Sequence, residues 1–323
     1  MAAPISTAAA FAGLVDLASE RLGGKALAAS DDFFAEKENL LKPGRGIFIE
    51  DKYTDRGKWM DGWESRRKRT PGHDWCVIQL GLPGTIRGVD VDTNHFLGNA
   101  PSFVSLDAAT SPDGPWTEIL PRSPVNPGAQ NLFGVASGAV WTHVRLNIYP
   151  DGGVARFRVY GDVQPAATAA GALADLAALT NGGRAVACSD MFFSSMTNLI
   201  MPGRGVNMGD GWETKRRRGP GHDWVILQLA RVGAVKKLEI DTAHFKGNFP
   251  DTASVDACHA PGQPVDGLTW PNYTWREVLP RQKLRADAVH VFEAELVDIG
   301  PVSHVRLNIY PDGGVSRFRV YGE

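Results

Sequence analysis

The stretch HVRLNIYPDGGVARFRVYG, from His143 to Gly161, recurs almost unchanged as HVRLNIYPDGGVSRFRVYG, from His304 to Gly322. Only one of the 19 positions differs, where Ala155 in the first stretch corresponds to Ser316 in the second. Chance does not produce such agreement, so the chain contains an internal duplication.

The match extends outward from these stretches through most of both halves. GWESRRKRTPGHDWCVIQL, which begins at Gly62, corresponds to GWETKRRRGPGHDWVILQL, which begins at Gly211. DTNHFLGN, from Asp92, corresponds to DTAHFKGN, from Asp241. A length of about 150 residues suits one domain, so we expect two repeats, 1–163 and 164–323, joined near Pro165.

Each repeat has extra residues that the other lacks. In the first repeat they lie around Glu50 to Lys58, and in the second near Gly262 to Asn272. Both stretches are polar or rich in proline and glycine, which predicts surface loops.

Composition excludes several classes of protein. A formal net charge of −2 gives no long-range attraction to nucleic acid or anionic membranes. No run of about 20 apolar residues exists to span a membrane, and the N-terminus has no basic region typical of a signal peptide. Cys76, Cys188 and Cys258 form no metal or disulfide pattern, which predicts reduced thiols that fill the core and a cytoplasmic location.

The residue pattern predicts an all-β fold in which a short helix opens each repeat. Trp75–Leu80 and Ile86–Val91 have the character of strands, separated by a turn at 81–84. Val144–Tyr149 alternates apolar and polar residues, and the turn residues at 150–153 predict a hairpin with Val154–Tyr160. Many short strands with glycine and proline turns predict an antiparallel sandwich or jelly roll.

A hairpin of the strands 75–80 and 86–91 would bring their outer ends together. His73, Asp74, Asp92 and His95 would then share one rim, and Asn99 follows in the next loop. The second repeat has the same residue types at His222, Asp223, Asp241, His244 and Asn248. Such a cluster can bind a divalent metal, through His222, Asp241 and His244, or transfer protons. The same residue types also tie loops to the backbone, a purely structural role.

A basic segment lies close to this rim in both repeats. Arg66 and Arg67 correspond to Lys215 and Arg216, and an acidic residue precedes each pair, Glu64 in one repeat and Glu213 in the other. Arginine binds carboxylates through two hydrogen bonds, so these residues, with Arg145 and Arg306 on the polar face of their strands, are candidates for binding an anion. A solvated charged loop is the alternative interpretation.

The phrases GRGVNMGDGWETKRRRGPGHDW, IDTAHFKGNFP and HVRLNIYPDGGVSRFRVYG closely resemble the allantoicase family, and the resemblance covers nearly the whole chain. It implies two tandem jelly-roll domains of galactose-binding-like fold. It also implies an enzyme of purine catabolism, a homo-oligomer, that hydrolyses allantoate to ureidoglycolate and urea. In the first repeat KWMDGWES replaces NMGDGWET, so the second repeat matches the family pattern better and is the preferred site.

Allantoate has a carboxylate and two ureido groups on one carbon, and this chemistry assigns roles to the residues. A cation must hold the carboxylate, amides and acids must hold the ureido groups, and a base must activate water or assist the loss of urea. A metal-bound water is the alternative to such a base. The expected base comes from Glu213, His222, Asp241 and His244, or from Glu64, His73, Asp92 and His95. The expected substrate-binding residues are Lys215, Arg216, Asn248 and Arg306, or Arg66, Arg67, Asn99 and Arg145.

Two other functions are compatible with the pattern. One is a neighbouring ureide hydrolase or lyase, such as an enzyme acting on ureidoglycolate. The other is a non-catalytic sandwich that binds carbohydrates or other small ligands, because fold alone does not fix function. Loop ends rich in histidine, aspartate and arginine favour an enzyme over such a module.

Overall fold

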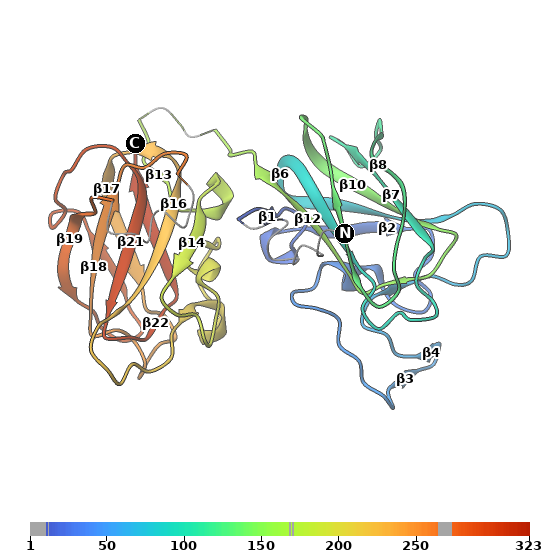
Figure 1. The fold of residues 1–323 in the computed structure, drawn as a ribbon, viewed down its shortest axis with the longest axis horizontal. Coiled ribbons are helices and arrows are strands. Elements are labelled where there is room, and N and C mark those ends of the chain that lie inside the picture. Colours follow the sequence, from blue (N-terminus) through green and yellow to red (C-terminus); the bar gives the residue numbers. More distant parts are fainter. Residues whose placement is uncertain (1–10, 12, 168, 170, 264–272) are drawn as a thin grey trace, which may run out of the picture. The chain divides into compact units, whose positions relative to one another are not determined.

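The computed structural model describes residues 11, 13–167, 169, 171–263 and 273–323. The chain forms two compact units, Met1–Gln164 and Pro165–Glu323, and each is an antiparallel β-sandwich (Figure 1). The predicted all-β fold with two tandem domains is therefore confirmed. None of the described helices is long and apolar enough to cross a membrane.

The described part of the N-terminal repeat contains twelve strands and two short 3₁₀ helices. The strands are β1 (Val15–Asp16), β2 (Lys25–Ala29), β3 (Tyr53–Thr54), β4 (Gly57–Lys58), β5 (Trp63–Glu64), β6 (Asp74–Asp92), β7 (Phe103–Ala109), β8 (Thr117–Pro124), β9 (Gln130–Gly134), β10 (Val140–Tyr149), β11 (Gly153–Val154) and β12 (Arg156–Val163). The 3₁₀ helices are η1 (Glu20–Leu22) and η2 (Lys37–Leu41).

The C-terminal repeat has the same plan. Its strands are β13 (Ala174–Asp175), β14 (Arg184–Cys188), β15 (Trp212–Glu213), β16 (Asp223–Gly233), β17 (Val235–Asp241), β18 (Thr252–Cys258), β19 (Arg276–Lys283), β20 (Val289–Phe292), β21 (Val302–Tyr310), β22 (Gly314–Val315) and β23 (Arg317–Gly322). Its 3₁₀ helices are η3 (Leu179–Asn181), η4 (Met196–Ile200) and η5 (Met208–Asp210).

Two sheets form the sandwich of each repeat. In the C-terminal repeat their strand orders are β14-β16-β21-β18-β19 and β13-β23-β17-β20. The N-terminal repeat has equivalent pairings, but the single long strand β6 contributes to both sheets. Its first part pairs with β2 and β10, and its second part pairs with β9 and β12.

Two predicted hairpins are wrong. Trp75–Leu80 and Ile86–Val91 do not pair with each other, because they are the two parts of β6 and bind different partners. Likewise β10 pairs with β6 and β7, whereas β12 pairs with β1 and β6. Residues 150–153 therefore connect one sheet to the other. Alternation of side chains shows which face a residue occupies, but it does not select the neighbouring strand.

The predicted rim nevertheless forms. The Asp74 amide donates to the Pro150 carbonyl over 3.1 Å, and the Ala155 amide donates to the Asp92 carbonyl over 2.7 Å. Both ends of β6 therefore reach the connection between β10 and β12. The short opening helix of each repeat is smaller than expected, because only the three-residue elements η1 and η3 form there.

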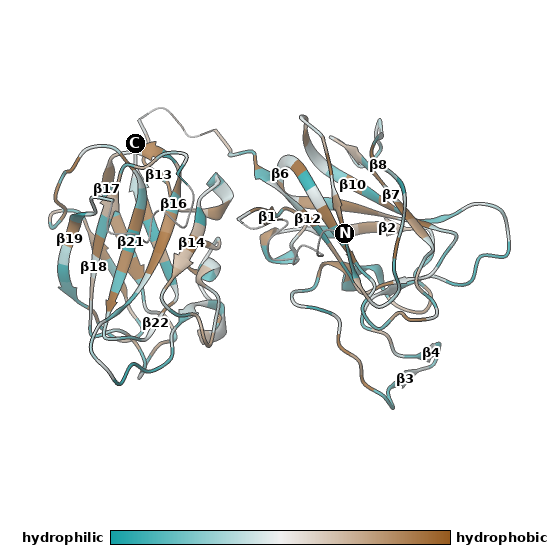
Figure 2. Ribbon diagram, in the orientation of Figure 1, coloured by the Kyte–Doolittle hydropathy of each residue, from teal (hydrophilic) through white to brown (hydrophobic). Residues whose placement is uncertain are grey.

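The core lies between the two sheets, where apolar side chains alternate along the strands (Figure 2). Cys76 and Cys258 are buried in the core, Cys188 is half-buried, and all three are free thiols. The extra residues of the first repeat are exposed and include the β3–β4 ladder, as expected of a surface loop. Most of the extra residues of the second repeat lie outside the described residues.

Asp90 is an acidic group whose protonation affects the stability of the N-terminal repeat. Burial raises the pKa of Asp90 to about 6, although the Gln130 amide donates to its Oδ2 over 2.6 Å. This value exceeds the unfolded value of 3.8. The contribution of protonated Asp90 to the free energy of unfolding is therefore full below pH 3.8 and is lost as the pH rises through 6.

We expect Asp90→Asn to weaken the pH dependence of the free energy of unfolding between pH 4 and pH 7, because asparagine does not titrate. Denaturant titrations at several pH values measure this dependence, and substitution of the exposed Asp113 by asparagine is the control. If the unfolding free energy of Asp90→Asn varied with pH as steeply as that of wild type, the prediction would be wrong.

Candidate functional site

Glu64 lines a surface cavity of about 360 Å³ at the rim of the N-terminal repeat. The preceding Trp63 is fully buried, and its indole nitrogen donates to the Asp31 carbonyl over 2.9 Å. Successive side chains of a strand point to opposite faces, so the anchored Trp63 directs Glu64 outward. We call this space the Glu64 cavity. Its lining residues are Phe34, Phe48, Gly57, Lys58, Met60, Glu64, His95, Leu97, Gly98 and Asn99.

The Glu64 carboxyl is held in one orientation and is partly desolvated. The Asn99 side-chain nitrogen donates to Glu64 Oε1 over 2.7 Å, which leaves Oε2 for a ligand or a water molecule. Burial raises the pKa of Glu64 above its ordinary value, although the hydrogen bond from Asn99 acts in the opposite direction. A carboxyl with a raised pKa is better suited to transfer protons near neutral pH.

His95 enters the same cavity from the turn after β6. Its backbone has a φ of +69°, in the left-handed region that residues other than glycine rarely occupy. His244 has the same conformation in the other repeat, with a φ of +71°. His95 Nε2 lies 3.2 Å from the Gly46 carbonyl, which only accepts, so Nε2 carries the proton. In the neutral ring Nδ1 is then an acceptor of hydrogen bonds.

The predicted basic residues line a second cavity, of about 500 Å³, next to the first. Phe34 lines both cavities. Arg66 is paired with Asp31 at 2.6 Å and Lys68 with the buried Asp74 at 2.6 Å, so alternate cations of the loop are neutralised. Arg67 is exposed and has no ion pair among the described residues. We call this space the Arg67 cavity.

His73 belongs to a separate polar network on the sheet formed by β6, β10 and β7. Its Nε2 contacts the Asn147 oxygen at 3.3 Å, and its ring lies against Tyr149 with 4.5 Å between centroids. Arg145 in this network is paired with Asp107 at 2.8 Å. The C-terminal repeat has the same network, in which the members are His222, Asn308, Tyr310, Arg306 and Asp256.

Asp92 has a structural partner rather than a place in a cavity. It is 2% exposed, and Arg45 donates to both of its oxygens over 2.9 and 3.0 Å. Asp241 is also 2% exposed and is paired with Arg204 at 3.4 Å.

The structure therefore divides the predicted cluster into separate parts. Glu64, His95 and Asn99 line one cavity, whereas His73 and Asp92 bind other partners. Within the described ranges, no three histidine, cysteine or acidic side chains are arranged to hold a metal ion. The predicted metal set of His222, Asp241 and His244 is therefore not assembled, because each residue is bound to its own neighbours.

The C-terminal repeat has the equivalents of the Glu64 cavity residues. Asn248 donates to Glu213, and His244 Nε2 contacts the Gly205 carbonyl at 2.8 Å. Lys215 is paired with Asp190 at 3.6 Å, while Arg216 is exposed. The asparagine–glutamate hydrogen bond and the histidine–carbonyl contact of the first repeat thus recur in the second repeat.

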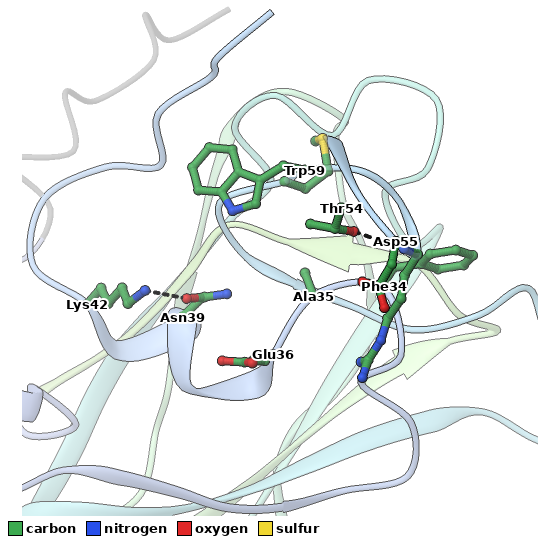
Figure 3. A pocket seen from close by; sticks show the side chains of 10 residues that line it. Phe34, Ala35, Glu36, Asn39, Lys42, Thr54, Asp55 and Trp59 are labelled. Carbon is green, nitrogen blue, oxygen red and sulfur yellow. Dashed lines mark hydrogen bonds between the residues drawn. The ribbon is translucent and has the colours of Figure 1, made fainter. Parts of the chain in front are cut away.

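The extra residues of the first repeat build part of the site, which the sequence did not indicate. Gly57, Lys58 and Met60 line the Glu64 cavity, and Phe48 stacks on His95 with 5.6 Å between ring centroids. A third cavity, of about 340 Å³, separates the same segment from η2 (Figure 3). There Trp59 faces Asn39, to which Lys42 donates a hydrogen bond. In the sequence, only the place of these extra residues, shortly before Glu64, could have indicated that they contribute to the site.

Comparison with known proteins gives a consistent result. The family model for the allantoicase repeat matches residues 15–164 and again residues 174–323. A protein of Burkholderia mallei named probable allantoicase 1 is 53% identical over 316 residues, covering 95% of this chain and 94% of its own length. Probable allantoicase of Photobacterium profundum is 51% identical over 320 residues, covering 97% of both chains.

A solved structure agrees with these sequences. The crystal structure of allantoicase from Saccharomyces cerevisiae superposes with a TM-score of 0.80 at 39% identity. The alignment covers 96% of this chain and 93% of the yeast chain.

Proposed function

This chain belongs to the allantoicase family, and on that basis we propose that it hydrolyses allantoate to ureidoglycolate and urea with the side chains of the Glu64 cavity. The observation that carries the assignment to this cavity is the meeting of Glu64, Asn99 and His95 around one space of about 360 Å³. This activity is a step of purine catabolism that releases nitrogen as urea.

Glu64 is the proton-transfer group of the reaction. The bond between the central carbon and one ureido nitrogen breaks, a bond from that carbon to the water oxygen forms, and urea leaves. Glu64 accepts a proton from the water and returns it to the leaving nitrogen, so protons balance. Its raised pKa suits both steps, and such catalysis contributes about 10²–10⁴-fold to the rate.

Asn99 and His95 complete the site. Asn99 is a positioning residue, since its amide fixes Glu64 Oε1 and turns Oε2 toward the substrate. His95 Nδ1 accepts a hydrogen bond from the second ureido group, because Nε2 is already bound to the Gly46 carbonyl. Arg66 and Arg67, the cations predicted for the carboxylate, line the adjacent cavity on the other side of Phe34.

Urea release from allantoate tests this proposal. The purified protein is expected to release one urea for each allantoate consumed, and to act on ureidoglycolate more slowly by at least about a factor of 10. Faster turnover of ureidoglycolate favours the neighbouring ureide activity. Absence of urea from both substrates, together with sugar binding, would favour the non-catalytic module.

Assembly and location complete the proposal. We expect a homo-oligomer, which light scattering on the purified protein measures directly. The three free thiols support the expectation of a reducing, cytoplasmic location.

A further inference from the structure

The two repeats differ most in the segment that precedes β5 or β15. In the N-terminal repeat this segment is Ile47–Asp61, which we call the insert segment, and in the C-terminal repeat it is only Val206–Asp210. Both segments are closed in the same way. Asp61 Oδ2 accepts from the Ile47 amide over 2.9 Å, and Asp210 Oδ2 accepts from the Val206 amide over 3.1 Å. The insert segment is therefore an enlargement of a loop whose two ends are fixed identically in each repeat.

The insert segment forms one wall of the Glu64 cavity. Phe48, Gly57, Lys58 and Met60 come from it, while Glu64, His95 and Asn99 come from the part shared by both repeats. The C-terminal repeat, with Glu213, His244 and Asn248, has only the short η5 turn at the corresponding place. The residue types assigned to proton transfer occur in both repeats, but only the first repeat has the added wall.

Lys58 brings an unneutralised positive charge to this wall. Its Nζ lies 4.6 Å from the centroid of the Phe48 ring and 5.9 Å from that of Tyr53. Within the part of the chain that the structure describes, no acidic oxygen lies within ion-pair distance of Lys58. By contrast, Arg66, Arg145 and Arg306 are each paired with an aspartate at 2.6–2.8 Å. The short segment Val206–Asp210 of the C-terminal repeat contains no lysine or arginine.

We propose that Lys58 binds the carboxylate of the substrate in the N-terminal repeat, an inference that rests on the proposed function. Allantoate is an anion, and Glu64 in its ionised form repels it. A cation across the same cavity offsets this repulsion and holds the carboxylate away from Glu64, so that a ureido group faces Glu64 and Asn99. The C-terminal repeat has no counterpart of the insert segment, and Lys246 there stands at the place of Leu97, which lines the Glu64 cavity.

Steady-state kinetics of Lys58→Met and Arg67→Met test this proposal, because the two cations line adjacent cavities. We expect Lys58→Met to raise KM for allantoate by about 10- to 100-fold with little change in kcat, as loss of a charged binding contact does. Lys58→Arg should restore most of the lost affinity, and Arg67→Met should stay within about threefold of wild type. A larger effect of Arg67→Met than of Lys58→Met would overturn the assignment.

A neutral analogue separates binding of the carboxylate from a structural role of Lys58. With the carboxamide of allantoate, wild type and Lys58→Met should have equal kcat/KM, because no charge remains for the lysine to bind. An equal loss on allantoate and on the carboxamide would show that Lys58 only supports the loop and would overturn the proposal.

Failure of the proposed function has a different signature. If wild type releases no urea from allantoate, hydrolysis itself is wrongly assigned. Calorimetric titration with allantoate then still tests Lys58. Weaker binding to Lys58→Met than to Arg67→Met supports the assignment, and equal binding to both variants, or no binding to wild type, overturns it.

Discussion

Replacing Glu64 by glutamine is expected to lower kcat for urea release by about 10²–10⁴-fold. Glutamine preserves the size of the side chain and can still accept the hydrogen bond from Asn99 at the Oε1 position. It cannot accept a proton from water, so the loss should appear in kcat rather than in KM. Initial rates at saturating allantoate measure the effect.

The matched control is Glu213→Gln in the other repeat. Asn248 donates to Glu213 as Asn99 donates to Glu64, so the two substitutions disturb equivalent hydrogen bonds. We expect Glu213→Gln to keep kcat within about twofold of wild type, since the C-terminal repeat has only the short η5 turn in place of the insert segment. A loss of activity in Glu213→Gln with none in Glu64→Gln would place the reaction in the C-terminal repeat.

The second large effect concerns stability, at the buried pair of Arg156 and Asp61. Arg156 Nη2 lies 2.8 Å from Asp61 Oδ2, and the two side chains are 5% and 9% exposed. We expect Arg156→Met to destabilise the N-terminal repeat by about 3–5 kcal/mol, because it leaves a buried carboxylate without its cation. The same carboxylate holds the Ile47 amide, so the insert segment should loosen as well. Hydrogen exchange of the β6 and β12 amides measures the loss of stability, and exchange of the Ile47 amide measures the loosening of the insert segment.

A surface ion pair provides the control for this prediction. Arg87 and Asp162 are 2.7 Å apart, and their side chains are 48% and 40% exposed. Water screens such a pair, so Arg87→Met should cost no more than about 1 kcal/mol. Equal costs for Arg87→Met and Arg156→Met would show that burial of the Asp61 carboxylate does not matter.

Local sequence patterns predicted the strands of this fold but not their partners. The alternation in Val144–Tyr149 correctly identified a strand with one buried face. The turn residues after it equally suit a hairpin within one sheet and a connection between two sheets. The structure has the second arrangement, in which β10 and β12 each pair with a different part of β6 and not with each other. Both arrangements place the strand ends at one rim, so the predicted rim formed although the predicted pairing was wrong.

The sequence predicted the site residues only where the same residue types occur in both repeats next to a strand. Glu64 follows a buried tryptophan, and His95 and Asn99 follow the end of β6, so their residue types and spacing marked them in both repeats. Lys58 lies in a segment without a counterpart, and nothing in its local sequence shows that the loop folds back onto Glu64. His73 and Asp92 have the right chemistry, but hydrogen bonds to Asn147 and Arg45 commit them elsewhere.

The most direct test is a crystal structure of the Glu64→Gln protein soaked with allantoate. We predict that the ligand lies in the cavity of the first repeat, with a ureido group toward residue 64 and Asn99 and its carboxylate at Lys58. Allantoate bound instead at the His73 network, in the Arg67 cavity or beside Glu213 would contradict this arrangement.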